Sequence, residues 1–83
     1  MEHNLYSIRD EKALAFGPVF QARNHALMAR IVAQSCPPDS PMGLYPNEFS
    51  VWHIATYDDE NADVRTVQPV NLGNVETYLP KRD

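Results

Sequence analysis

Hydrophobic and polar residues alternate in two stretches of the chain, and a period of two is typical of β-strands. In residues 5–9, Tyr6 and Ile8 fall on one side and the intervening residues on the other. Residues 49–57 alternate over a longer run and are largely apolar on both sides. We therefore expect a short first strand and a longer central strand that is covered on both faces.

Strict alternation also assigns the side chains of the central strand to its two faces. One face would carry Phe49, Val51, His53, Ala55 and Tyr57, and the opposite face Trp52 and Ile54. An acidic turn at residues 58–63 leads into a third predicted strand at residues 64–70. Pro69 restricts that strand to a sheet edge or a strand end, because proline has no backbone N–H to donate. The tail, residues 72–83, forms either a short strand or an irregular arm.

A helical period follows Asn24, which is a favoured N-cap residue. At about 100° per residue, the apolar arc of this helix is formed by Leu27, Met28, Ile31 and Val32. The helix should end near residues 34–36, because Pro37 and Pro38 cannot continue it.

Two further stretches are predicted to be loops. Gly17 and Pro18 interrupt residues 13–20, whose apolar side chains we expect to fold back onto the core as a packed loop. Residues 36–48 are rich in proline and predict a long, mobile loop. The fold class that follows is α+β. A small sheet of three strands, in the order β-α-β-β, packs on one helix within a single domain of residues 1–83.

The size of the chain predicts self-association. A domain of 83 residues buries only about 60–65% of its unfolded surface, and small domains of this kind depend on disulfides, metals or oligomerisation. Cys36 is the single cysteine, so an internal disulfide is excluded. We expect a homo-oligomer, with a dimer favoured. The sequence shows neither a signal peptide nor an apolar run of about 20 residues, so we expect a cytosolic protein and no membrane partner.

Residues that carry chemistry are scattered. His3, His25 and His53 lie in unrelated predicted elements without metal-ligand spacing, and we expect His53 to be a strand residue with a hydrogen-bonded ring. Asp59, Asn61 and Asp63 resemble the start of a calcium loop. Val64 and Val70 stand where that loop needs glycine and glutamate. With three glycines in the whole chain, a phosphate-binding glycine loop is missing too. We predict no catalytic residue, no metal site, no cofactor and no enzyme activity.

Arginines interleaved with aromatic residues form the strongest candidate for a binding site, because this composition is typical of surfaces that bind single-stranded nucleic acid. The candidate residues are Arg9, Arg23, Arg30, Arg65, Tyr6 and Trp52. A net charge of −4 argues mildly against this interpretation. The alternative is that the aromatic residues build the core and the arginines form solvated ion pairs.

An ordered set of short matches extends over residues 4–70. It comprises residues 5–12, then Phe16, Pro18 and Phe20, then Asn24 and residues 29–30, and finally residues 46–49 and 54–59. In this order they resemble the small nonstructural protein of gokushovirus-type microviruses, tailless phages with circular single-stranded DNA. Relatives often carry a glycine in the turn where this chain has Asn61 and Ala62.

The resemblance implies a non-capsid protein that acts in the cytoplasm of the infected bacterium. Such a protein would assist genome replication or the transfer of the genome to packaging, and its partners would include phage replication or procapsid proteins. No family active site can be transferred to these positions. Two hypotheses stay open: an accessory that binds single-stranded DNA, and an oligomeric module that binds a phage or host protein without nucleic-acid contact.

Overall fold

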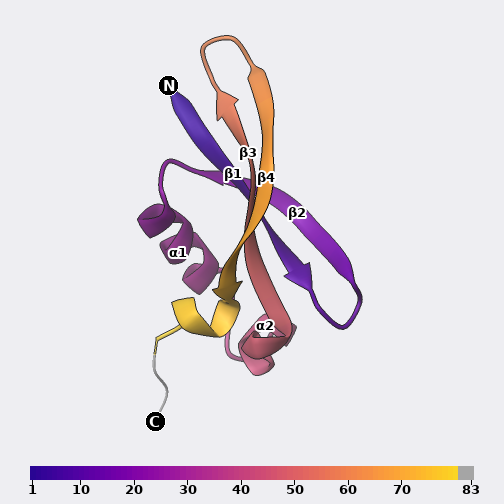
Figure 1. Cartoon of the computed structure of the whole chain (residues 1–83). Coiled ribbons are helices and arrows are strands. Elements are labelled where there is room, and N and C mark those ends of the chain that lie inside the picture. Colours follow the sequence, from indigo (N-terminus) through magenta and orange to yellow (C-terminus); the bar gives the residue numbers. More distant parts are fainter. Residues whose placement is uncertain (81–83) are drawn as a thin grey trace.

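Four antiparallel strands form a single sheet in the order β2-β1-β3-β4. In this computed structural model, which describes residues 1–80, the strands are β1 (Glu2–Asp10), β2 (Ala15–Ala22), β3 (Phe49–Asp58) and β4 (Asp63–Asn74). The helical elements are α1 (His25–Gln34), α2 (Pro41–Leu44) and two 3-10 turns, η1 (Pro46–Glu48) and η2 (Val75–Tyr78). The strands cross at the centre of the molecule, and α1 and η2 lie together on one side of them (Figure 1).

The predicted fold class is wrong, because the protein is predominantly β and its sheet has four strands. The additional strand is β2, which contains Gly17 and Pro18, the residues that predicted a packed loop. Ser7 pairs with Val19 but Arg9 pairs with Phe16, so the register shifts at this point. Strand β2 is also an edge strand. Proline is tolerated at a sheet edge and at a bulge, because no ladder hydrogen bond is lost there.

A second register shift changes which side chains share a face. Leu5 pairs with Ala55, whereas the next residue, Tyr6, pairs with His53, so Ile54 is the extra residue in β3. Strict alternation across β3 is therefore broken. Residues 49, 51 and 53 face the same side as Tyr6, while Trp52 shares the opposite side with residues 55 and 57. The prediction that β3 is central is confirmed, whereas the predicted division of its side chains is wrong.

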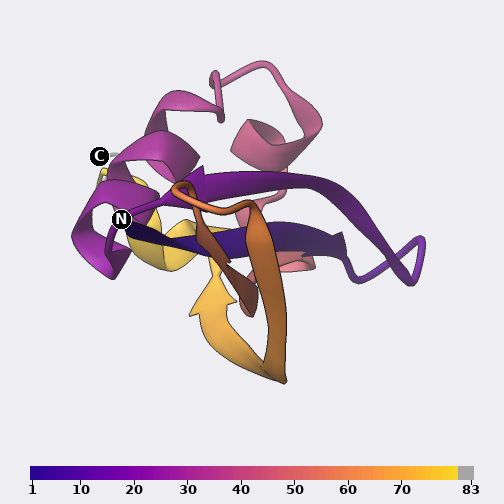
Figure 2. The ribbon, with the colours of Figure 1, turned by 90° about the horizontal axis from the view of Figure 1, so that it is seen from above.

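The hydrophobic core lies on one face of the sheet, beneath α1 and η2. Its buried members are Tyr6, Ala22, Met28, Val32, Cys36, Val51 and Val75. Figure 2 shows the β3–β4 hairpin turning away from the β1–β2 pair, so the sheet is strongly twisted and its centre carries the core. Tyr6, Ala22 and Val51, the members of the core that lie on strands, share this face of the sheet.

The predicted helix is confirmed at both ends. Asn24 accepts a hydrogen bond from the backbone N–H of Leu27 at 2.8 Å, as an N-cap does, and the helix ends at Gln34 before the two prolines. Of the predicted apolar arc, Met28 and Val32 are buried.

The segment predicted as a mobile loop, residues 36–48, is largely ordered into α2 and η1. Gly43 lies directly against the backbone of Pro37, and a Cβ atom at this glycine would come within 1.9 Å of the Pro37 carbonyl oxygen. Only glycine fits this close approach, which folds the segment back on itself.

The tail takes part in the fold. Strand β4 continues through Pro69 to Asn74, and it is an edge strand, as Pro69 predicts. Val75 in η2 is fully buried, and Tyr78 and Leu79 pack against the core. Residues 81–83 of the predicted tail lie outside the described residues.

Val75→Ala tests whether the tail is part of the core. Removing two methyl groups from a fully buried side chain should lower the free energy of unfolding by about 2 kcal/mol. Thr77→Ala is the matched control in the same turn, because Thr77 is exposed, and its effect should stay within about 0.5 kcal/mol. The measurement is urea unfolding followed by circular dichroism. Equal effects of the two variants would show that the tail does not stabilise the domain.

Candidate nucleic-acid interface

The face of the sheet opposite α1 and η2, which we call the open face, carries aromatic and aliphatic side chains together with an arginine. The strand register places Leu5, Arg9, Phe16, Val19, Trp52, Tyr57 and Val64 on it. Phe16, Val19 and Val64 are each exposed by at least half of their surface. Phe16 and Val19 are close together on β2, whereas Val64 lies on β4 at the other edge of the sheet. Exposed apolar side chains that are grouped, as on β2, mark interaction sites.

An aromatic pair with an arginine above it forms the centre of the open face. The rings of Phe16 and Trp52 meet edge to face with centroids 5.7 Å apart, and the guanidinium carbon of Arg9 lies 5.7 Å from the Phe16 centroid. Trp52 Nε1 donates to Ser50 Oγ at 2.8 Å, and Ser50 Oγ donates to Glu11 Oε1 at 2.6 Å. The second oxygen of Glu11 accepts from Arg9 Nη1 at 2.9 Å. The network holds the indole and the guanidinium in fixed positions.

This arrangement can bind flat, apolar rings beside a negative charge. A nucleobase can stack on an exposed aromatic side chain, and the phosphate that follows it can contact a guanidinium. Phe16 is 50% exposed and Trp52 is half-buried. Arg9 retains donors beyond the one bonded to Glu11, because a guanidinium carries five N–H groups.

The structure separates the six residues that the sequence predicted as a site. Arg9 and Trp52 share the open face. Tyr6 is fully buried in the core, where its hydroxyl hydrogen-bonds His25 Nδ1 at 2.7 Å, so it is inaccessible to a base. Burial raises the pKa of the Tyr6 hydroxyl.

The other three arginines lie elsewhere. Arg23 precedes α1, and Arg30 is exposed on that helix. Arg65 alternates with Val64 on β4 and so faces away from the open face. Its Nε donates to Asp63 at 2.8 Å, and this hydrogen bond raises the pKa of the guanidinium.

Phe16 and Tyr57 belong to this surface but were not among the six predicted site residues. Phe16 was expected in a loop packed on the core, and Tyr57 was expected on the face opposite Trp52. The available signal was the alternation of Leu5, Ser7 and Arg9, which does define the open face of β1. The register shifts that bring the two aromatic residues onto that face have no equally clear sequence signal.

Two of the three histidines, which the sequence placed in unrelated elements, lie close together in the structure. The rings of His25 and His53 lie 6.0 Å apart beside Tyr6. The expected hydrogen bond to His53 is absent at one nitrogen: among the described residues, its buried Nε2 has no partner.

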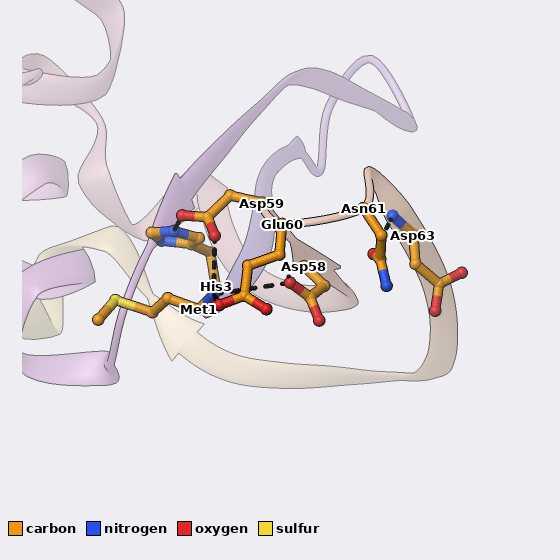
Figure 3. Close-up of polar contacts among 7 residues, drawn as sticks. All are labelled: Met1, His3, Asp58, Asp59, Glu60, Asn61 and Asp63. Carbon is orange, nitrogen blue, oxygen red and sulfur yellow. Dashed lines mark hydrogen bonds and ion pairs between the residues drawn. The ribbon is translucent and has the colours of Figure 1, made fainter.

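The acidic turn between β3 and β4 forms one end of the sheet (Figure 3). The Met1 amino group lies 2.7 Å from Asp59 Oδ1, and His3 Nε2 lies 2.8 Å from the other oxygen of Asp59. The hydrogen bond from the amino group, with a smaller contribution from His3, lowers the pKa of Asp59. Asp63, by contrast, points away from this cluster (Figure 3). Within residues 1–80, no group of three or more His, Cys, Asp or Glu side chains is placed to hold a metal ion.

No helix in the described part of the chain is long and apolar enough to span a membrane.

Comparison with known proteins identifies a family. The model of a family described as Phage ORF5 protein matches residues 3–78, a range that covers the four strands apart from Glu2, together with α1 and η2. No curated protein and no solved structure matches the chain. Because the matched residues make up nearly the whole chain, this protein belongs to the Phage ORF5 protein family and is a phage protein.

Proposed function

We propose that this phage protein is a non-enzymatic accessory that binds single-stranded DNA on the open face of its sheet. In this proposal, bases stack on Phe16 and Trp52, and Arg9 contacts the phosphate backbone. The observation that carries it is the edge-to-face pair of half-exposed Phe16 and half-buried Trp52, with the Arg9 guanidinium above Phe16.

Packing considerations support a binding role for this pair. A small domain uses most of its aromatic side chains in the core, and Tyr6 and Phe20 are used in this way, with ring centroids 5.7 Å apart. Phe16 is instead half exposed on the sheet face that lacks the core. Stacking of a base on such a side chain contributes about 1–3 kcal/mol and does not depend on the base, which suits a protein that contacts a whole genome.

The proposal also covers the type of phage from which the protein comes. The ordered matches in residues 4–70 favour a nonstructural protein of a gokushovirus-type microvirus, whose genome is single-stranded DNA. Binding to that DNA in the bacterial cytoplasm would assist genome replication or packaging, with phage replication or procapsid proteins as further partners.

The charge distribution favours one orientation of the DNA. The acidic turn with Asp58, Asp59 and Glu60 lies at one end of the sheet and would repel a phosphate backbone. Arg9 lies near the opposite end of β1 and Lys12 in the turn that follows, where Glu11 and Glu48 pair with them and balance their charge. We therefore expect the strand to cross the sheet at Phe16 and Trp52 and to avoid the β3–β4 turn.

Exchanging single arginines tests the location of the site. Arg9→Gln should weaken binding of a fluorescein-labelled dT oligonucleotide about tenfold, because a charge-assisted contact to phosphate is lost. Arg30→Gln removes the same charge from α1, on the other side of the sheet, and should change the dissociation constant less than about threefold. Fluorescence anisotropy at low salt measures both. Equal losses would place the DNA somewhere other than the open face.

The salt dependence should be shallow for a nucleic-acid binder. One arginine on the open face predicts one or two phosphate contacts, and each contributes about −0.7 to the slope of log K against log salt for a single strand.

Phe16→Ala should weaken binding by about 1–3 kcal/mol and leave that slope unchanged, because stacking releases no counterions. Tyr6→Phe should retain wild-type affinity and should lower the free energy of unfolding by about 1 kcal/mol. Absence of binding at low salt would refute the proposal and favour a protein partner.

A further inference from the structure

An apolar groove of about 670 Å³ separates the β1–β2 hairpin from α1 and α2. The apolar residues that line it include Ile8, Phe16, Phe20, Ile31, Met42 and Phe49. The polar residues that line it already have partners. Ser35 Oγ and Ser40 Oγ donate to backbone carbonyls, and Asp10 accepts from two backbone N–H groups in the adjoining turn. An occupant of this groove would therefore be apolar.

Leu14 lies beside the groove as an exposed apolar side chain on a left-handed turn backbone. It occupies the β1–β2 turn between Ala13 and Ala15, both of which line the groove, and it is 71% exposed. Its φ is +57°, in the left-handed region that favours glycine or asparagine. An exposed leucine and a left-handed backbone are both unfavourable, and burying this side chain in a partner would offset both.

The protein exposes more surface than a compact monomer of the same mass, and a partner could cover the excess. The accessible surface is 5553 Å², whereas a compact monomer of this mass exposes about 5,000 Å². The radius of gyration is 13.1 Å, against about 12 Å for a compact domain of this length. Two copies that each hid about 500 Å² would bury about 1,000 Å², the lower bound for a specific interface.

Charge favours contact on this side of the molecule. The turns of the two hairpins lie at opposite ends (Figure 1), so the acidic β3–β4 turn is remote from the groove. Near the β1–β2 turn, Glu11 is paired with Arg9 and Glu48 with Lys12. The edge of β2 is a poor alternative, because Pro18 and the register shift interrupt its hydrogen-bonding groups.

We propose that a second copy of this chain occupies the groove, with Leu14 of each copy inserted into the groove of the other. Such an interface is self-complementary, as twofold symmetry requires. Trp52 and Tyr57 lie on the other face of the sheet, whereas Phe16 lines the groove as well as the open face, so the two surfaces meet at Phe16. A dimer would present two open faces to one DNA strand, and joint binding would raise the affinity without new contacts.

Leu14→Gly separates dimerisation from folding, because glycine relieves the backbone at the same position while it removes the side chain. Analytical ultracentrifugation of the wild type over a concentration series should show a transition from 9.4 kDa to twice that mass. The Leu14→Gly dimer should dissociate at least tenfold more readily, while the melting temperature of the monomer is unchanged or raised.

Ala62→Gly is the matched control, because Ala62 has a φ of +60° in the other hairpin turn. This variant should gain the same backbone relief and dimerise like the wild type. Ala13→Asp places a charge in the groove lining and should also prevent dimerisation. A wild type that stays monomeric at millimolar concentration would overturn the proposal. So would a dimer that survives both Leu14→Gly and Ala13→Asp.

Discussion

The packing of Tyr6 is the interaction on which the rest of the structure depends. This side chain is fully buried, stacks on Phe20 of β2, contacts His53 of β3, and hydrogen-bonds His25 at the start of α1. It thus joins three strands and the helix on one face of the sheet. Because the core forms around this residue, the opposite face is left without a covering layer, and its aromatic side chains are free for another use.

The elements that were predictable depend on local chemistry. Asn24 and the two prolines after residue 36 define the ends of α1, and alternation defines the faces of β1. Strand β2 and the division of β3 into two faces were not predictable, because both depend on register shifts. A bulge is stable only when a neighbouring strand accepts it, so Gly17, Pro18 and Ile54 carry no unambiguous local signal.

The candidate site was predictable in composition more than in geometry. Arg9 and Trp52 do lie on one face, but Tyr6 belongs to the core. Of the remaining arginines, Arg30 lies on α1, Arg23 just before it, and Arg65 on the edge strand β4. The same shift that moves Ile54 out of register brings Tyr57 to the side of Trp52. A protein with an acidic net charge can therefore present a local surface of aromatic rings and one arginine, with Glu11 paired to that arginine and a further cluster of carboxylates at the far turn.

Stacking of bases on the open face can be followed through Trp52, because it is the only tryptophan in the chain. The measurement is its fluorescence during titration with an unlabelled dT oligonucleotide at low salt. Stacking of a base near the indole should quench its emission saturably, with the dissociation constant found by anisotropy. Emission that stays unchanged while the oligonucleotide binds would contradict it, because the DNA would then lie away from Trp52.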